Sequence, residues 1–484
     1  MRATRILILL TALFLMQFDS SSAYLQPSLR VRGLSPGLAG IMTDRETDIF
    51  LNPAYLGTLE KYEVFAEGAY DDQIYAGGVF PLVGNLNCLL SGVFEKYDYK
   101  TDRFSAVTRW IEWNEPYYTI YSTSSQSQPD KSWSGAGKVG LGITLSPKLS
   151  LGVDFSIRYG TESPKSWSNY ERSIFTLVGD TLVSSYSSED QDIEDADSTI
   201  YSLRGGAQIL LDEGTRLDFL LRYSHFKTDD DHKDFSFYRY VDSLHHSSTE
   251  SYYGHDDEFS REGNLIGGHL RFVKGTADLC HWQILLGVSR RSFDIYSSSW
   301  EKDFDYWIYN STFNADSSWS ATLDTIEVKS WLITTGAGLE KKVGNNFRLF
   351  TGVKCNLCFD DRKRWQNSLD SLKHVDNDTS YSSSDIRPGV LVEDKLELFE
   401  VNLPFAMEFF PRKNLALRGG GQLTWKRSLV SPYRSSAMLK EETEFLRSFG
   451  FTYILKNKLL FEGLSTTGDI FELRDWNLRV TYRF

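Results

Sequence analysis

The sequence predicts an all-β fold: a transmembrane antiparallel β-barrel of 14–16 strands, best counted as 16, with a short N-terminal plug. Three observations support this prediction. A basic and then apolar leader opens the chain, apolar and polar residues alternate along paired segments, and tight turns alternate with long polar connections. Alternation with a period of two indicates β-strands. Short turns that alternate with long loops are typical of outer-membrane barrels.

The leader has the three parts of a secretory signal peptide. Met1–Arg5 is basic, Ile6–Phe18 is apolar but short for a membrane span, and small residues precede a cleavage site after Ala23. An uncleaved anchor is the alternative, but the short apolar run and its small-residue exit favour cleavage. We therefore expect a signal peptide (1–23), an N-terminal plug (24–60) and a barrel (61–484) in the bacterial outer membrane.

The clearest hairpin spans residues 138–159, where two alternating segments flank a tight Ser-Pro-Lys turn. The same unit returns in five further hairpins, at 201–223, 264–288, 331–353, 403–425 and 445–461. Between the hairpins lie polar segments that we expect to be long extracellular loops: 98–135, 160–199, 226–262, 292–326 and 359–396.

The two faces of these strands differ in chemistry. One face is apolar and is expected to contact lipid, which makes outer-membrane lipid a partner of the chain. The other face is polar and is expected to line the lumen, where charged side chains cost little. The lumen-facing candidates are Asp154, Arg158, Arg204, Arg216, Asp218 and Arg222.

The composition is compatible with this reading and limits other functions. A mean hydropathy of -0.34 would suit a soluble protein, but averaging hides the apolar face of a barrel. Two segments, 161–200 and 226–262, carry net charges of -7 and -6, which together equal the formal net charge of -13. These acidic segments would repel nucleic acid, so we expect none as a partner.

Metal, redox and enzymatic chemistry are not expected. Cys355 and Cys358 have C-x-x-C spacing, but an offset of three in a strand puts their sulfurs on opposite faces. Five histidines lie among acids in one segment, without the fixed spacing of a metal motif, so a solvated acidic loop is favoured over a metal site. These are His225, His232, His245, His246 and His255. No convincing Ser/His pair stands out outside the predicted loops, and we expect no catalytic residue, metal or cofactor.

The last strand, Trp476–Phe484, ends in alternating apolar residues. Its final aromatic pair, Tyr482 and Phe484, resembles the C-terminal signal that the outer-membrane barrel assembly machinery reads. This resemblance implies the assembly machinery as a partner.

Residues 32–57, RGLSPGLAGIMTDRETDIFLNPAYLG, resemble the N-terminal region of the FadL/OmpP1 family and of the related PorV-type proteins. The shared features are three glycines, two acids and an Asn-Pro-Ala motif: Gly33, Gly37, Gly40, Asp44, Asp48, Asn52, Pro53 and Ala54. Tyr55 stands where many members have Gly. The resemblance implies a plug inside the lumen. Asn52 can bond backbone groups, Pro53 fixes the turn and Ala54 permits close approach to the wall.

The resemblance implies passive uptake of a hydrophobic or amphipathic small molecule of the long-chain fatty acid type. The alternative is a PorV-like barrel that transports nothing and scaffolds a secretion or surface complex, with those proteins as partners. A continuous apolar pocket would favour transport, whereas a lumen packed with charge pairs would favour the scaffold.

Overall fold

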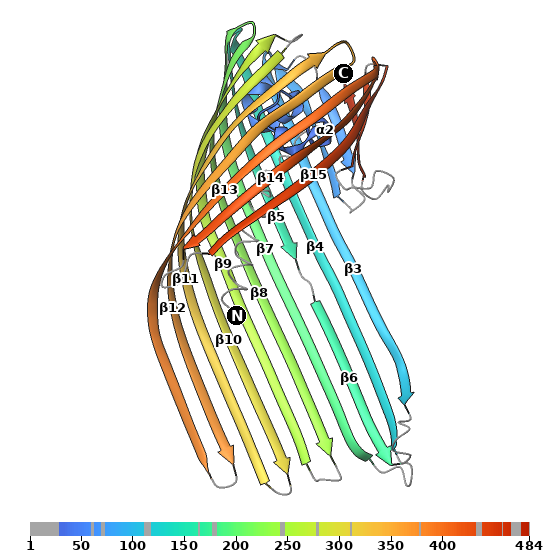
Figure 1. Ribbon diagram of the computed structural model, residues 1–484, viewed down its shortest axis with the longest axis vertical. Helices are drawn as coiled ribbons and strands as arrows, with labels where there is room; N and C mark the ends of the chain where they lie inside the picture. The colour runs from blue at the N-terminus through green and yellow to red at the C-terminus, as the bar shows by residue number, and fades with distance from the viewer. Residues whose placement is uncertain are drawn as a thin grey trace.

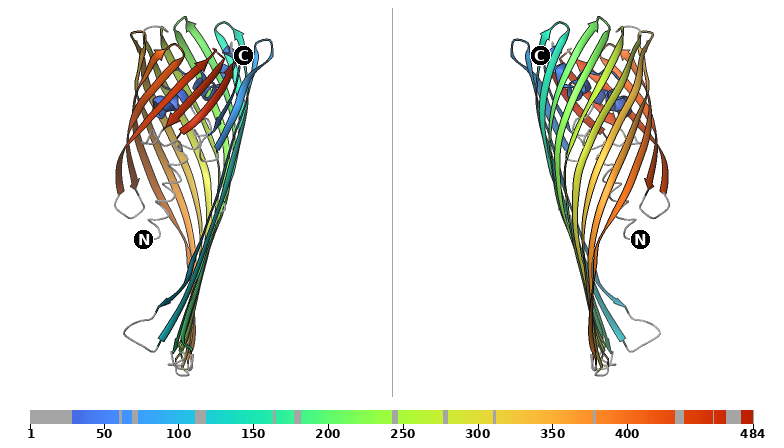
Figure 2. Two further views of the ribbon diagram at one scale, coloured as in Figure 1. Left: turned by 90° about the vertical axis from the view of Figure 1, so that its right-hand side faces the viewer. Right: turned by 90° about the vertical axis from the view of Figure 1, so that its left-hand side faces the viewer.

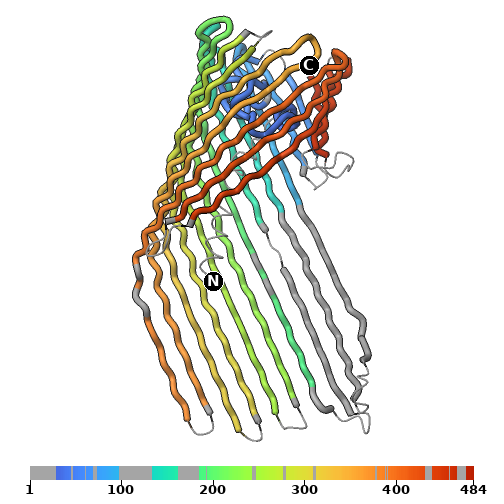
Figure 3. Tube along the Cα trace, viewed as in Figure 1, coloured from blue at the N-terminus to red at the C-terminus, as the bar shows by residue number. Residues whose placement is uncertain are grey.

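The structure is a computed structural model, and Figure 3 traces its chain. It describes residues 29–59, 62–68, 73–110, 118–162, 165–176, 182–242, 247–276, 280–309, 312–376, 379–431, 438–456, 458–465 and 476–483. The predicted signal peptide (1–23) and Phe484 lie outside these residues.

Short helices open the described chain and strands follow. The helices are α2 (Leu29–Leu34), η1 (Pro36–Leu38), α3 (Arg45–Leu51) and η2 (Pro53–Thr58). The strands are β1 (Glu63–Gly68), β2 (Gln73–Val83), β3 (Leu86–Trp110), β4 (Tyr118–Ser146), β5 (Leu149–Glu162), β6 (Lys165–Thr176), β7 (Leu182–Asp212), β8 (Thr215–Asp242), β9 (Ser247–Thr276), β10 (Cys280–Tyr309), β11 (Thr312–Val343), β12 (Phe347–Asp376), β13 (Ser380–Arg412), β14 (Leu415–Ser431), β15 (Met438–Leu455), β16 (Leu459–Ser465) and β17 (Trp476–Arg483).

The strands form one closed antiparallel sheet. Apart from β5 and β6, each strand pairs with its neighbours in the chain, and β1 pairs with both β2 and β17, which closes the barrel. The short strands β5 and β6 follow one another in the same place between β4 and β7. The 17 strands among the described residues therefore occupy 16 positions around the barrel, which confirms the predicted count.

Apolar residues point out of the barrel and polar residues point in, as the alternation predicts. In the β4–β5 hairpin Val139 and Phe155 are 49% and 46% exposed, whereas Lys138 and Asp154 are 6% and 2% exposed. Closure leaves no free strand edge within this part of the wall. None of the helices among the described residues is long and apolar enough to cross a membrane.

The predicted long loops are wrong for most of their length, because the strands continue through them. Strands β8 and β9, for example, are paired along their whole length. The Thr215–Lys274 pair lies at one end of this ladder and the Asp242–Ser247 pair at the other. Figures 1 and 2 show these extensions as a flattened sheet that projects beyond the shorter strands β1, β2 and β14–β17. A strand with two polar faces lacks the apolar alternation that reveals a strand in a sequence, yet its backbone can pair equally well.

Residues 29–59, called the N-terminal segment below, lie inside the barrel at the end of the tight turns (Figure 1). One part, with Val31, Leu34 and Met42, packs against Phe350 and Ala406 of the wall. A second part packs Phe50 and Leu56 against β1, β2 and β3. The segment is thus held on two sides by apolar contacts.

Candidate functional site

The Asn-Pro-Ala motif joins the N-terminal segment to the wall. Asn52 caps η2, because its Oδ1 accepts a hydrogen bond from the Ala54 amide at 3.0 Å. Its Nδ2 donates to the carbonyls of Ala207 on β7 and Phe219 on β8, at 3.2 and 3.3 Å. Pro53 occupies the first helical position, where its missing N–H costs nothing. One side chain therefore fixes both the local turn and its place on the barrel.

Glycines on the inner face of the wall make room for this contact. A Cβ at Gly152 would lie 2.2 Å from the Pro53 carbonyl, and one at Gly206 would lie 1.9 Å from Asn52 Oδ1. Gly338 and Gly420 give the same close approach to the carbonyls of Ile41 and Leu34. Glycines that recur on the polar face of alternating strands are the sequence signal for this close contact between the wall and the N-terminal segment. They were not among the predicted site residues.

A buried cluster around Tyr55 anchors the middle of the segment. The Tyr55 hydroxyl donates to Asp218 Oδ2 at 2.6 Å and accepts from Arg271 Nη2 at 2.5 Å. Arg271 also pairs with Asp48 at 2.6 Å and with Asp218 at 2.9 Å. The Arg216 guanidinium lies 4.8 Å from the Tyr55 ring centroid and 3.4 Å from Asp218. Burial raises the pKa of Tyr55 well above its usual value, so its hydroxyl keeps the hydrogen that it donates.

Asp154 forms a second buried group with Lys138 and Arg204, at 3.1 and 2.6 Å. The Lys138 ammonium also donates to the Phe50 carbonyl at 3.4 Å, which ties this group to the N-terminal segment. Arg158 and Arg222 line a cavity of about 50 Å³ beside it. Of the six lumen-facing candidates, three contact the N-terminal segment or a residue that does: Asp154, Arg216 and Asp218.

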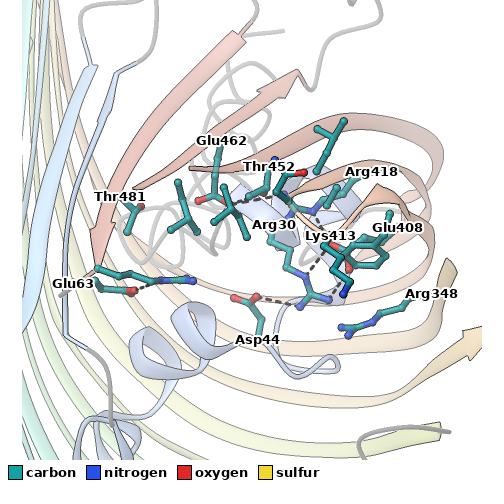
Figure 4. A pocket seen from close by; sticks show the side chains of 17 residues that line it. Arg30, Asp44, Glu63, Arg348, Glu408, Lys413, Arg418, Thr452, Glu462 and Thr481 are labelled. Carbon is teal, nitrogen blue, oxygen red and sulfur yellow. Dashed lines mark hydrogen bonds and ion pairs between the residues drawn. The ribbon is translucent and has the colours of Figure 1, made fainter. Parts of the chain in front are cut away.

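A third polar group surrounds a cavity of about 240 Å³ at the turn end of the barrel (Figure 4). Arg30 donates to both carboxylate oxygens of Glu408, at 3.2 and 3.0 Å, and pairs with Asp44 at 3.3 Å. Glu408 also accepts from Arg418 at 2.8 Å. Burial by itself lowers the pKa of Arg30, but the Glu408 and Asp44 carboxylates outweigh burial and raise it above its ordinary value. Arg30 and Glu408 were not among the predicted site residues, because pairing between such distant positions leaves no local pattern in the sequence.

Farther along the strands, the inner face carries a buried apolar cluster among polar residues. Phe226, Phe293, Ile295 and Val328, called the inner apolar patch below, form one buried cluster on β8, β10 and β11. Phe226 lies eight residues beyond Asp218 on β8, which is about 26 Å along a strand. The patch therefore lies well away from the N-terminal segment.

The remaining predicted sites give little chemistry. Tyr482 pairs with Val64 of β1 and Leu459 of β16 and is 42% exposed, so it is part of the seam that closes the barrel. The described parts of the chain hold no group of three or more His, Cys, Asp or Glu residues that could bind a metal. His245 and His246 lie outside these parts. Cys355 is half-buried and Cys358 is buried, and neither forms a disulfide.

No family model and no curated protein matches this chain. Among solved structures, a FadL homologue from Pseudomonas aeruginosa is 11% identical, with 94% of this chain and 98% of that one covered and a TM-score of 0.36. The toluene transporter TbuX of Ralstonia pickettii is 10% identical, with coverage of 94% and 96% and a TM-score of 0.31. The siderophore receptor PiuA of Acinetobacter baumannii is 7% identical, with coverage of 88% and 82% and a TM-score of 0.27.

Likenesses with TM-scores this low carry no inference about function. The resemblance to PorV-type proteins stays a prediction. The structural neighbours of this closed 16-strand barrel include FadL homologues.

Proposed function

We propose that the protein is an outer-membrane channel for the passive uptake of hydrophobic or amphipathic small molecules, with the N-terminal segment as its plug. The observation that carries this proposal is the N-terminal segment, which lies inside a closed barrel and is held there by close glycine contacts and buried ion pairs. No catalytic step is part of the proposal.

The route has two ends with different chemistry. A molecule would enter between the strand extensions, contact the inner apolar patch and then meet the N-terminal segment. Passage requires that segment to move, because it is bonded to β7, β8, β9 and β13. The wall glycines and the buried ion pairs favour the plugged state between passages.

A second function, a scaffold that transports nothing, draws support from the charge pairs of the interior. Asp154, Asp218 and Glu408 are each buried and each bound to arginine. Most of this pairing lies against the N-terminal segment, however, and it holds that segment rather than filling the lumen beyond it. These three charge pairs are therefore accounted for by the plug and do not require a scaffold function.

Reconstitution in lipid vesicles tests the proposal. Vesicles with the full mature chain and protein-free vesicles would be compared for the initial rate of uptake of a labelled long-chain fatty acid. We expect faster uptake with the protein. Equal rates would contradict the transport function and leave the scaffold function in place.

A further inference from the structure

We infer that Arg261, with Arg291 and Arg362 beside it, forms an oxyanion-binding site on the inner face of the barrel. The ligand class is a carboxylate or phosphate group, either free or as the head of an amphipathic molecule. This inference deepens the proposed function and rests on it, since it assigns the charge of the molecule that enters the barrel.

The strand register brings these arginines together. Arg261 on β9 lies directly opposite Ile295 of β10, two residues from Phe293. Phe293 lies opposite Val328 of β11, which in turn lies opposite Arg362 of β12. Arg291 precedes Phe293 by two residues on the same inward face. The charged groups that act on Arg261 are accordingly Arg291, Arg362 and Asp360.

Two guanidinium groups share one aromatic ring at this place. The Cζ of Arg261 lies 4.1 Å and that of Arg291 lies 5.1 Å from the centroid of Phe293. Arg261 Cζ also lies 5.1 Å from the Phe226 centroid. Each cation–π contact is favourable, but two like charges over one ring repel each other. An anion between them would remove that repulsion.

Arg261 is buried without an anion of its own. It is 6% exposed, and its Nε and Nη2 have no hydrogen-bond partner among the described residues. No carboxylate of the described residues lies within ion-pair distance of it, whereas Arg362 pairs with Asp360 at 3.2 Å. Burying a guanidinium with open donors is costly, and its planar fork matches carboxylate and phosphate oxygens. These open donors point to a ligand.

The position suits a molecule that arrives from the extended end. On the outer face of β10, the apolar run ends at Val288. At the level of the arginine site the outer face is polar, with Arg290 on β10 and Lys329 on β11. The site therefore lies near the mouth of the apolar-walled barrel. Phe226, Ile295 and Val328 pack around it as a buried apolar cluster, which keeps water away from the arginine.

Equilibrium dialysis of the full mature chain in lipid nanodiscs would test the site with two probes, radiolabelled inorganic phosphate and radiolabelled octyl phosphate. The variants are Arg261→Gln, Arg261→Lys and the control Arg239→Gln, whose side chain is 55% exposed on the β8 extension. We expect Arg261→Gln to weaken binding at least about tenfold, Arg261→Lys to weaken it less and the control to bind as the wild type. Heat-dependent migration in gels would show that each variant forms the barrel.

The two probes distinguish a site for free anions from a site for the head group of an amphipath. Arg261-dependent binding of both probes supports a site for free anions, and such binding of octyl phosphate alone supports a site for the head group of an amphipath. Binding that is absent, or equal in the wild type and Arg261→Gln, overturns the inference. Fatty acid uptake could still proceed in that case, so failure of this site and failure of the transport function remain distinguishable.

Discussion

The Tyr55 hydroxyl of the N-terminal segment donates a hydrogen bond to Asp218 Oδ2 of β8 at 2.6 Å, inside the barrel. The Tyr55→Phe change removes this bond and the one that Arg271 donates, and it leaves both charged groups buried. We expect a loss of about 1–3 kcal/mol in the free energy of unfolding, measured by urea titration in vesicles. Tyr201→Phe is the control, since Tyr201 is 43% exposed on the outer face. Equal losses in both variants would contradict the assigned role.

Gly206→Ala tests the close approach of the Asn-Pro-Ala motif. The new Cβ would lie 1.9 Å from Asn52 Oδ1, so the segment must shift away from β7. Faster hydrogen exchange in residues 29–58 is expected, measured by mass spectrometry. Gly205→Ala is a matched control one residue away, because a Cβ there meets no atom within 4 Å. If both variants exchange at the wild-type rate, the motif does not hold the segment on the wall.

Asn52→Asp separates the capping role of Asn52 from its hydrogen bonds to the wall. Asp caps a helix as well as Asn does, so a role in capping alone predicts no change. A carboxylate cannot donate to the carbonyls of Ala207 and Phe219 and would repel them. We therefore expect Asn52→Asp to speed exchange of residues 29–58 more than Asn52→Ala does. The reverse order would mean that capping is the main role of this side chain.

Glu408→Gln tests the ion pairs at the turn-end cavity. The change leaves Arg30 and Arg418 without their shared carboxylate, and breaking a buried pair in this way costs about 3–5 kcal/mol. Urea unfolding in vesicles would show this loss. Glu441→Gln should stay within about 1 kcal/mol of the wild type, because its pair with Arg427 is exposed. A Glu408→Gln variant as stable as the control would argue against this anchor.

Periodicity in the sequence was sufficient to predict the barrel, because lipid on one side and a polar lumen on the other impose a strict alternation of two. Val139 and Lys138 show this contrast in exposure. The strand extensions were not predicted, because water on both of their faces removes the apolar signal. Residues 229–242 of β8, which pair with β9, are an example.

The candidate site was predictable only in part. Asp154, Arg204 and Asp218 were predicted to face inward because side chains alternate between the two faces of a strand. Once one residue is assigned to a face, the faces of the other residues of that strand follow. This alternation could not show that Arg30 would meet Glu408 or that Arg261 would lie over Phe293. Those contacts depend on the order of strands around the barrel and on the path of the N-terminal segment.

The central claim is that molecules pass only when the N-terminal segment moves. Gly33 of α2 and Gly450 of β15 allow a lock, because a Cβ at Gly33 would lie 3.5 Å from Gly450 Cα, within reach of a disulfide. The double variant Gly33→Cys/Gly450→Cys would carry Ala at the four native cysteines. The variant with Gly450→Cys alone is the control, since its new Cβ would lie 3.0 Å from the Gly463 carbonyl oxygen.

Uptake of labelled fatty acid into vesicles, before and after reduction of this disulfide, is the most direct measurement. The oxidised protein should take up no more than protein-free vesicles, and reduction should restore the rate of the single variant. Equal uptake by the oxidised and reduced forms, above that of protein-free vesicles, would contradict the claim that the segment is the plug.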